Sequence, residues 1–504
     1  MDKRYILAVD QSTSATKVQL IHFMGKIVAK RSRSHRQYYP NPGWSEHDPV
    51  EIYRNVTDLM QQIVEQSAID PQEIAAVSIA NQRETAVVWD KDTGMPVYPA
   101  IVWQCRRTAD ACERWKEQGM EEVVRSKTGL TLDPYFSATK IRWILDHVEG
   151  AQEKAARGRL LCGTIDSWLI WKLTDGAVHA TDYTNASRTM LFNIFDLKWD
   201  RELLELFGIP SGMLPQVKYS DEIFGEMEWE GLKLPISGVV GDSHGALLGQ
   251  MCLEAGMVKA TYGTGSSLLM NTGVRAIEPD KGLATTIAYA FGNRVVYALE
   301  GIIHSTGDTL KWMQDQLGLF ETFQEAEEMA ASLPDNDGVY VIPSFSGLGA
   351  PYWKPYMKAS IIGMTRRSGK KHIIRAGMES IAYQVKDVLD LMQDVSGLSI
   401  KELRVDGGPT TNRFLMQFQA DIAQVKVIRA EFPGLSSMGS AYLAGIGTGL
   451  WTKEQIRSLN GSKQAFVPLM DSRLSRKYYD EWKRNISLMV EASDKTLPVN
   501  AIPK

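Results

Sequence analysis

Short apolar runs alternate with longer amphipathic stretches along most of the chain. The apolar runs are rich in β-branched residues and predict strands at residues 5–9, 18–22, 74–79, 85–89, 338–342 and 403–405. The amphipathic stretches predict helices at residues 49–67, 108–117, 371–395 and 472–491. Because Asp48 precedes Pro49, the first of these helices has a well-marked start. Strands that alternate with helices in this way predict an α/β fold.

One pattern occurs twice, about half the chain apart. Residues 5–20 and 258–270 each read as an apolar strand, a loop of small polar residues and a second apolar strand, which predicts a hairpin. Small side chains leave backbone N–H groups exposed, and such a loop can surround a phosphate. Two loops of this kind predict two lobes that close on one polyphosphate, as in a nucleotide-dependent phosphotransferase.

The length and composition limit the class of protein. A chain of 504 residues exceeds one hydrophobic core, so we expect two domains, residues 1–250 and 251–504. A net charge of −4 without a long basic run argues against nucleic acid and anionic membranes as partners. The four scattered cysteines form no C-x-x-C pair, and no apolar run reaches the ~18 residues of a membrane span. We therefore expect a cytoplasmic protein without membrane insertion.

Two acidic residues follow apolar strands beside the two loops. Asp10 opens the first loop and is a candidate ligand of Mg²⁺, which prefers few carboxylates together with phosphate oxygens; it could instead cap its own turn. Lys17 would neutralise a phosphate or lie on the surface. Asp242 lies between glycines ahead of the second loop, where it could take a proton from a substrate hydroxyl or serve only as a turn residue. His244 is expected to be structural.

Residues at strand ends could bind a polyol. Arg83 and Glu84 follow the strand at residues 74–79, and together they offer donors and acceptors for vicinal hydroxyls; the alternative is a solvated ion pair. Trp103 and Tyr135 could form an apolar wall for a carbon chain, although each aromatic residue could equally belong to the core.

Several motifs, in order along almost the whole chain, resemble the FGGY-type carbohydrate kinases, and most closely the glycerol kinases among them. They are Pro42-Gly-Trp-Ser-Glu-His-Asp-Pro49, Asn81-Gln-Arg-Glu-Thr85, Ile101-Val-Trp-Gln-Cys-Arg-Arg-Thr108, the segment 181–193, Ser346-Gly-Leu-Gly-Ala-Pro-Tyr-Trp353, the segment 372–384 and Leu403-Arg-Val-Asp-Gly-Gly408. The resemblance implies two actin-like (ribonuclease H-like) domains with the active site in the cleft between them. It also implies ATP and Mg²⁺, a small polyol or sugar as substrate, and a homodimer or homotetramer.

The same resemblance implies roles for individual residues. Asp242 would be the general base and Asp10 would lie by the magnesium. The substrate pocket would be lined by Arg83, Glu84, Trp103, Tyr135, Asp242, Ser243 and Ser267. The nucleotide would contact Thr13, Ser14, Lys17, Thr264, Gly265, Gly307, Lys311, Gly408 and Asn412.

The sequence departs from the family pattern at six positions. Ser12 replaces Gly, Lys17 replaces Arg, Ser243 replaces Gln, Ser267 replaces Phe, Lys311 replaces Gln and Gly434 replaces Glu. Two of these changes remove volume beside the acceptor. We therefore predict ATP-dependent phosphorylation of a primary hydroxyl of glycerol or a closely related polyol. The alternatives are a kinase for a larger polyol or ketose, such as a tetritol, pentitol or pentulose, and a non-catalytic nucleotide-binding regulator.

Overall fold

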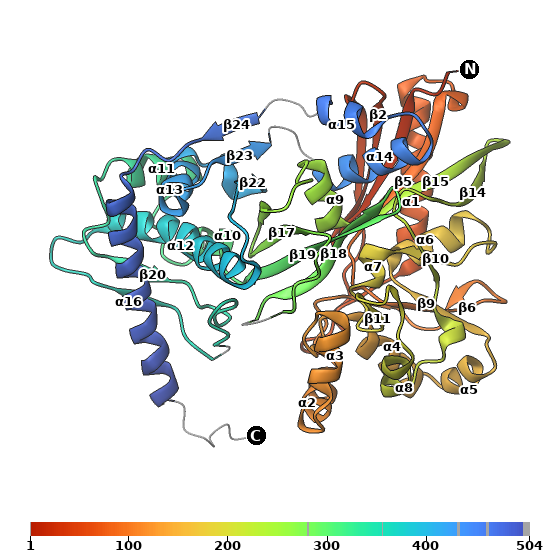
Figure 1. Cartoon of the computed structure of the whole chain (residues 1–504), viewed down its shortest axis with the longest axis horizontal. Coiled ribbons are helices and arrows are strands. Elements are labelled where there is room, and N and C mark those ends of the chain that lie inside the picture. Colours follow the sequence, from red (N-terminus) through yellow and green to blue (C-terminus); the bar gives the residue numbers. More distant parts are fainter. Residues whose placement is uncertain (1, 280–281, 355, 431–433, 460–462, 497–504) are drawn as a thin grey trace.

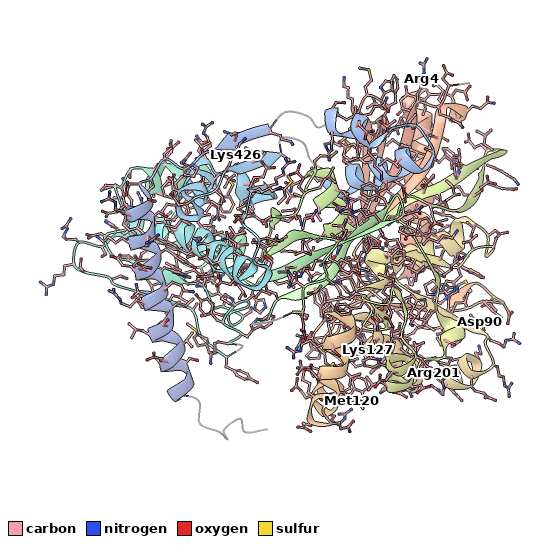
Figure 2. All side chains as sticks on the ribbon, viewed as in Figure 1. Arg4, Asp90, Met120, Lys127, Arg201 and Lys426 are labelled. Carbon is pink, nitrogen blue, oxygen red and sulfur yellow. The ribbon has the colours of Figure 1, made fainter. Side chains whose placement is uncertain are left out.

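The computed structural model describes residues 2–279, 282–354, 356–430, 434–459 and 463–496, with side chains as far as residue 493. Two large sheets dominate these residues, and helices cover them (Figure 1). The predicted α/β class is confirmed. Charged side chains are exposed on both halves, among them Arg4, Arg201 and Lys426, which are labelled in Figure 2. Among the described residues, no helix combines the length and the hydropathy that a membrane span requires.

The first sheet contains the first predicted hairpin. Its strands, in spatial order, are β14 (Ile223–Trp229), β15 (Leu232–Gly241), β5 (Ile74–Asn81), β1 (Tyr5–Gln11), β2 (Ala15–His22) and β3 (Ile27–Ser34). Strands β1 and β2 are antiparallel, which confirms the hairpin, whereas β5 runs parallel to β1. The polar ends of β1, β5 and β15 therefore lie at one edge of the sheet.

Alternate residues of β1 enter two different cores. Leu7 and Val9 pack with residues of α1 (Pro49–Ser67) and α6 (Ile165–Leu173). Ile6 and Ala8 pack on the opposite face with residues of α14 (Leu435–Gly447) and α15 (Lys453–Ser458). Since both faces are covered, β1 reads as a continuous apolar run and not as an alternating one.

The second sheet contains the second hairpin. Its strands, in spatial order, are β18 (Ala284–Phe291), β19 (Arg294–Ile303), β17 (Ser266–Gly273), β16 (Met257–Tyr262), β22 (Glu402–Asp406), β23 (Val427–Ala430) and β24 (Lys463–Phe466). Strands β16 and β17 are antiparallel and β22 is parallel to β16, so the arrangement around β1 is repeated around β16.

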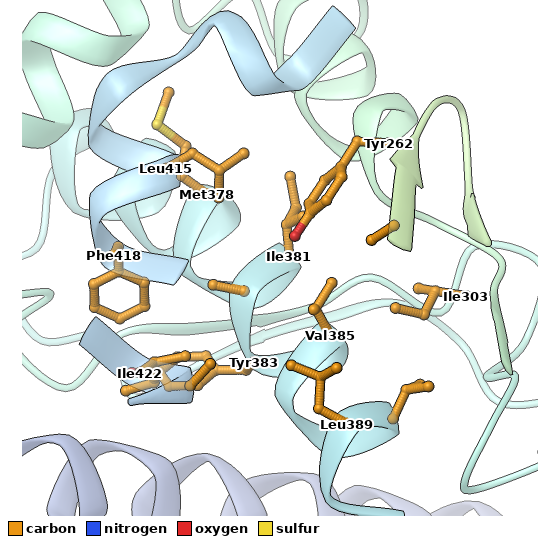
Figure 3. Close-up of a cluster of buried hydrophobic side chains, with 14 of the residues drawn as sticks. Tyr262, Ile303, Met378, Ile381, Tyr383, Val385, Leu389, Leu415, Phe418 and Ile422 are labelled. Atoms are coloured by element: carbon orange, nitrogen blue, oxygen red, sulfur yellow. The ribbon is translucent and has the colours of Figure 1, made fainter. Parts of the chain in front are cut away.

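The largest core lies behind this second sheet. Helices α12 (Lys370–Ser396) and α13 (Arg413–Ala423) cover it, and Figure 3 shows Tyr262 and Ile303 of the sheet beside residues of α12. Phe418 of α13 packs edge-on against Tyr383, with ring centroids 5.5 Å apart. Helix α16 (Ser472–Thr496) closes the far side through Trp482, which stacks on Tyr383.

A late segment of the chain returns to the first sheet. Helix α14 crosses α9 (Asp242–Gly249) and lies on β15, β5 and β1, among strands formed some 200 residues or more earlier (Figure 1). The two helices can approach closely because Gly439 has no side chain. A Cβ atom there would lie only 1.9 Å from the carbonyl oxygen of Gly245. The boundary at residue 250 stays a prediction, while residues 435–458 pack with the N-terminal strands.

Most predicted elements are present with shifted ends. The predicted helix at 49–67 is α1, and Asp48 caps it by accepting a hydrogen bond from the amide of Val50. The strand predicted at 85–89 is β6 (Val87–Asp90), and that at 338–342 is β20 (Tyr340–Ile342). The remaining α-helices are α2 (Ala109–Glu117), α3 (Met120–Thr128), α4 (Ser137–His147), α5 (Ala151–Ala156), α7 (Tyr183–Ala186), α8 (Arg201–Phe207), α10 (Gly307–Asp315) and α11 (Phe323–Ala331).

Candidate active site

A cavity of about 520 Å³ opens where the two hairpins face each other. The first sheet and its following loops contribute Thr13, Gln82, Arg83, Glu84, Trp103, Gln104 and Tyr135, and helix α9 contributes Asp242 and Ser243. The second sheet contributes Thr261, residues 263–267 and residues 302–304. The structure thus brings residues from both halves of the chain to one site.

Arg83 is the centre of the polar side of the cavity. Its Nη1 donates to Oε1 of Glu300 at 2.8 Å, and its Nη2 donates to the hydroxyl of Tyr135 at 3.0 Å. Its Nε lies 3.5 Å from Oδ1 of Asp242. Arg83 adopts a left-handed backbone conformation with φ of 51°, which a side chain of this size takes only when its surroundings hold it. The guanidinium is therefore fixed from three sides.

A second buried arginine completes a cluster of alternating charges. Nε of Arg188 lies 2.8 Å from Oε1 of Glu84, and its Nη2 lies 2.6 Å from Oε2 of Glu300. Burial alone would raise the pKa of Glu300, but Arg188 and Arg83 hold it well below its usual range. The carboxylate of Glu300 therefore stays ionised and holds both arginines in place, while Glu84 lines the cavity and offers it a hydrogen-bond acceptor.

Asp242 is the acid at the point where the sheets meet. It is the first residue of α9, and the amide of Ser243 donates to its Oδ1 at 2.6 Å. About a third of the side chain faces the cavity. Burial raises the pKa of this carboxyl, Arg83 opposes the shift, and the charge of Asp10 adds to it. A carboxylate made more basic in this way is a better proton acceptor.

The first hairpin has an ion pair between its two strands, whereas the described residues of the second hairpin form none. Asp10 and Lys17 face each other across β1 and β2, with Oδ2 and Nζ 3.5 Å apart. Burial raises the pKa of Asp10, and Lys17 opposes that shift. Among the described residues, no group of three or more potential protein ligands surrounds a metal position. One carboxylate beside a phosphate loop still fits Mg²⁺, which takes its remaining ligands from water and phosphate.

The second hairpin is held by its own backbone. The amide of Gly263 donates to the carbonyl of Gly265 at 2.8 Å, and the amide of Gly307 donates to the carbonyl of Gly263 at 2.9 Å. A Cβ atom on Gly265 would lie 2.4 Å from the carbonyl oxygen of Ile303, so no larger residue fits there. The loop therefore presents a fixed, neutral surface of amides and hydroxyls.

Two aromatic rings and two serines complete the wall. Trp103 and Tyr135 meet edge-on at 5.3 Å, and Nε1 of Trp103 donates to the hydroxyl of Thr13 at 2.9 Å. Ser267 donates to Oε1 of Glu300 at 3.4 Å, which is a long hydrogen bond. Ser243 follows Asp242 and also lines the cavity.

The structure does not bring every predicted site residue to this cavity. Residues outside its lining are Asp10, Ser14, Lys17, Gly307, Lys311, Gly408 and Asn412. Lys311 lies on the exposed side of α10 and pairs with Asp315 at 2.7 Å. Asn412 caps α13 by accepting from the amide of Leu415 at 2.8 Å. The nucleotide contacts predicted for six of these residues and the metal role predicted for Asp10 stay predictions.

Two departures from the family pattern have local structural explanations. Ser12 does not have a positive φ, and its hydroxyl donates to the carbonyl of Ala15 at 2.9 Å, so the turn does not require glycine. Gly434 has a φ of 89°, and a Cβ atom there would lie 2.2 Å from Nε2 of Gln19. The side chain of Gln19 thus fills space that a larger residue at position 434 would need.

Sequence reasoning missed Glu300, Arg188 and His304. Glu300 lies inside the apolar run 295–303, and an acidic residue in such a run indicates a buried charge with an opposite partner. Arg188 lies within the family-like segment 181–193, but nothing in that segment indicates a role for this residue. Nothing in the sequence around His304 marks it as a cavity residue.

The comparisons with known proteins agree with this geometry. Residues 5–249 match the N-terminal domain of the FGGY family of carbohydrate kinases, and residues 258–448 match its C-terminal domain. The chain is similar to the glycerol kinase of Caldanaerobacter subterraneus subsp. tengcongensis, at 49% identity over 486 residues, covering 96% of this chain and 98% of that protein. It is also similar to glycerol kinase 2 of Thermotoga maritima, at 50% identity over 487 residues, with coverage of 96% and 98%.

Solved structures show the same relationship. The glycerol kinase of Plasmodium falciparum with ADP superposes with a TM-score of 0.92 at 35% identity, covering 97% of this chain and 99% of that one. A xylulose kinase from Lactobacillus acidophilus, at 22% identity and a TM-score of 0.86, shares the fold, with coverage of 96% and 97%. These findings confirm the two-domain actin-like fold and an ATP-using kinase with a sugar or polyol acceptor. The chain belongs to the FGGY family of carbohydrate kinases.

Proposed function

We propose that this kinase transfers the γ-phosphoryl group of ATP to a primary hydroxyl of glycerol or a closely related polyol. The observation that carries this proposal is the position of Asp242. Its carboxylate lies beside Arg83, which also holds Glu300 and Tyr135, and it shares the cavity with loop residues Thr13 and Thr264 of the two hairpins. A hydroxyl bound there would have a base on one side and a phosphate cradle on the other.

The residues of the cluster have separate tasks in this reaction. Glu84 and Arg83 bind vicinal hydroxyls, and the wall of Trp103 and Tyr135 packs against the carbon chain. Asp242 accepts the proton of the attacking hydroxyl as the new O–P bond forms. The bond between the γ-phosphorus and the bridging oxygen breaks, and ADP leaves with that oxygen. Fixed hydrogen bonds around the acceptor supply most of what phosphoryl transfer needs from a protein.

Asp10 is the residue that we expect to hold Mg²⁺, directly or through water. When bound, the ion would neutralise charge on the transferring phosphoryl group. The nucleotide itself would lie along Thr13, Ser14 and Lys17 of the first hairpin and Thr264 and Gly265 of the second. Gly307, Lys311, Gly408 and Asn412 would contact its outer part, a proposal that rests on the family resemblance.

The test is release of ADP from ATP and Mg²⁺, measured with and without glycerol. We expect release to depend on the acceptor and the product to be a phosphate ester of a primary hydroxyl, identified by ³¹P NMR. Nucleotide binding without release of ADP for any polyol or sugar would favour a non-catalytic binding protein and contradict the proposal.

A further inference from the structure

We propose that His47 is a positioning residue of the transfer reaction, which holds Thr13 of the first hairpin and Trp103 of the acceptor wall in one fixed arrangement. This inference rests on the proposed kinase function and deepens it, because Thr13 would contact the nucleotide and Trp103 the acceptor. His47 itself lies outside the cavity lining, so it acts only through its neighbours.

His47 lies in the family-like segment 42–49, for which the site so far gives no purpose. Strand β4 (Glu46–His47) pairs with β8 (Ala100–Ile101), so His47 faces Ala100, and Trp103 follows β8 two residues later. The side chain of His47 is fully buried. Burial lowers its pKa to about 3, and the charge of His35 adds to the shift. His47 is therefore a neutral imidazole, with one nitrogen that donates and one that accepts.

One side of His47 leads to the backbone of the nucleotide loop. Its Nε2 lies 2.6 Å from Oε1 of Gln37. Nε2 of Gln37 in turn donates to the carbonyl oxygen of Thr13 at 2.9 Å. The position of this carbonyl therefore depends on His47 through a single amide side chain.

The other side of His47 leads to the acceptor wall and back to the same threonine. Nε2 of Gln82 lies 3.4 Å from Nδ1 of His47, the longest contact of the series, and Oε1 of Gln82 accepts from the hydroxyl of Thr85 at 2.9 Å. The amide of Trp103 donates to the hydroxyl of Thr85 at 3.2 Å, and its Nε1 donates to the hydroxyl of Thr13 at 2.9 Å. The hydrogen bonds thus form a closed ring that joins nucleotide loop and acceptor wall.

Backbone carbonyls fix the direction of these hydrogen bonds, because a carbonyl can only accept. Nε2 of Gln11 donates to the carbonyl of Ser12 at 2.9 Å, which leaves Oε1 of Gln11 to accept from Nε2 of Gln82 at 2.8 Å. The second hydrogen of this Nε2 is directed at His47, so Nδ1 of His47 accepts and Nε2 carries the proton. Gln37 then accepts at Oε1 and donates with Nε2. A residue at position 47 must supply both a donor and an acceptor to complete the ring.

The ring also directs the hydroxyl of Thr13. Its oxygen accepts from Nε1 of Trp103, so its hydrogen is left to donate into the cavity that Thr13 lines. A phosphate oxygen is a strong acceptor for such a donor. Since Trp103 packs against the acceptor in the proposed reaction, the same ring aligns the two substrates. Breaking it should weaken the contacts to both and disturb their alignment.

The experiment measures kcat and both KM values in the full chain with ATP, Mg²⁺ and glycerol. His47→Leu is similar in size and removes both nitrogens, so kcat/KM should fall about tenfold for ATP and for glycerol. His47→Gln keeps a donor and an acceptor on a planar group and should stay within about threefold of the wild type. Gln37→Leu breaks the same ring at a half-buried position, so it tests the proposal even where His47→Leu does not fold. It should raise KM for ATP about fivefold.

A double-mutant cycle separates action through Thr13 from general loosening of the fold. Trp103→Phe removes the indole N–H that reaches Thr13 from the far side of the ring. Because either change frees the same threonine, His47→Leu combined with Trp103→Phe should raise KM for ATP by less than the product of the two single effects. Effects that multiply fully would show that His47 does not act through Thr13 and would overturn the proposal.

His179→Leu is the matched control. This histidine also forms a hydrogen bond in the N-terminal half, with the carbonyl of Cys162 at 3.0 Å, but it lies outside the cavity lining. The variant should lower Tm and leave kcat and both KM values within about twofold of the wild type. Unchanged constants in His47→Leu, or an equal loss in His47→Gln, would overturn the positioning role and leave the kinase function standing. Absence of ADP release by the wild type with every acceptor would instead overturn the proposed function and the positioning role with it.

Discussion

The hairpins β1–β2 and β16–β17 occupy equivalent places in the two sheets. Each forms the antiparallel pair next to a central parallel strand, β5 in the first sheet and β22 in the second. Even the cross-strand positions correspond, since Asp10 faces Lys17 in the first and Thr261 faces Ser267 in the second. The first pair is charged, and the second pair carries only hydroxyls.

From this difference we propose that one backbone arrangement serves two purposes. The first hairpin contributes charge, with Asp10 proposed to hold the metal and Lys17 proposed to contact a phosphate. The second contributes shape. The hydrogen bonds of Gly263 and the close packing of Gly265 against the backbone hold its loop in place. The acid that the second lobe lacks on its hairpin is supplied by Asp242, from the helix that lies between the lobes.

Asp242→Asn should have the largest effect, because the amide cannot accept a proton. We expect kcat to fall about 10³-fold, while nucleotide binding changes by no more than a few-fold. Turnover should be measured under saturating ATP, and nucleotide affinity by calorimetry. An undiminished kcat would remove Asp242 from the role of general base and make the comparison of the hairpins irrelevant to the chemistry.

The pH dependence of kcat, compared between the wild type and Asp242→Asn, is a control for the role of Asp242. Burial and Asp10 raise the pKa of Asp242 in the folded protein. The base works only when ionised, so wild-type kcat should rise with pH through this raised pKa, above the ordinary value of 3.8 for aspartate. The residual activity of Asp242→Asn should lack this acid limb.

Asp10→Asn should come next, with a loss of about 10²-fold in kcat/KM for the ATP–magnesium complex, because it removes the charge of the first hairpin. Raising the Mg²⁺ concentration should restore part of the activity. The matched change on the second hairpin, Thr261→Val, should cost much less and show no Mg²⁺ dependence. Equal losses from both variants would show that the hairpins do not differ as proposed.

Gly265→Ala tests the shape of the second hairpin. The new Cβ would lie 2.4 Å from the carbonyl oxygen of Ile303 and 2.8 Å from that of His304, so the backbone must move. We expect KM for ATP to rise about 30-fold and the free energy of unfolding to fall by roughly 1–3 kcal/mol. Gly212→Ala, where a Cβ meets nothing within 4 Å, is the control and should leave Tm nearly unchanged.

Local features of this protein were predictable from sequence, and long-range pairs were not. The hairpins and the start of α1 follow from apolar runs, small loops and Asp48 ahead of a proline, all within a few residues of one another. The strand predicted to begin at Thr85 begins at Val87 instead. The reason is that the hydroxyl of Thr85 donates to Gln82 and accepts from the amide of Trp103, which holds it in the turn.

The residues of the site fall into the same two groups, those that the local sequence indicates and those that only the fold brings together. Asp242, Arg83 and Glu84 lie at strand ends, where polar residues after apolar runs are visible in the sequence. Glu300 is 217 residues from Arg83, and no periodicity connects them, so only the folded chain reveals the pair. The family resemblance supplied roles for Gly307, Gly408 and Asn412 that neither spacing nor the cavity lining indicates.

Ser267→Ala should have the smallest effect and gives the sharpest comparison, because Ser267 matches Lys17 in position. Removing its hydroxyl deletes one long hydrogen bond to Glu300. We expect KM for the acceptor to rise about threefold, with little change in KM for ATP. Lys17→Ala should do the reverse, raising KM for ATP about tenfold, because a charged contact to phosphate is lost. Both constants are obtained by varying one substrate at a saturating concentration of the other. If both variants raise KM for the same substrate, equivalent positions on the two hairpins contact the same ligand. In that case charge and shape are not divided between the lobes.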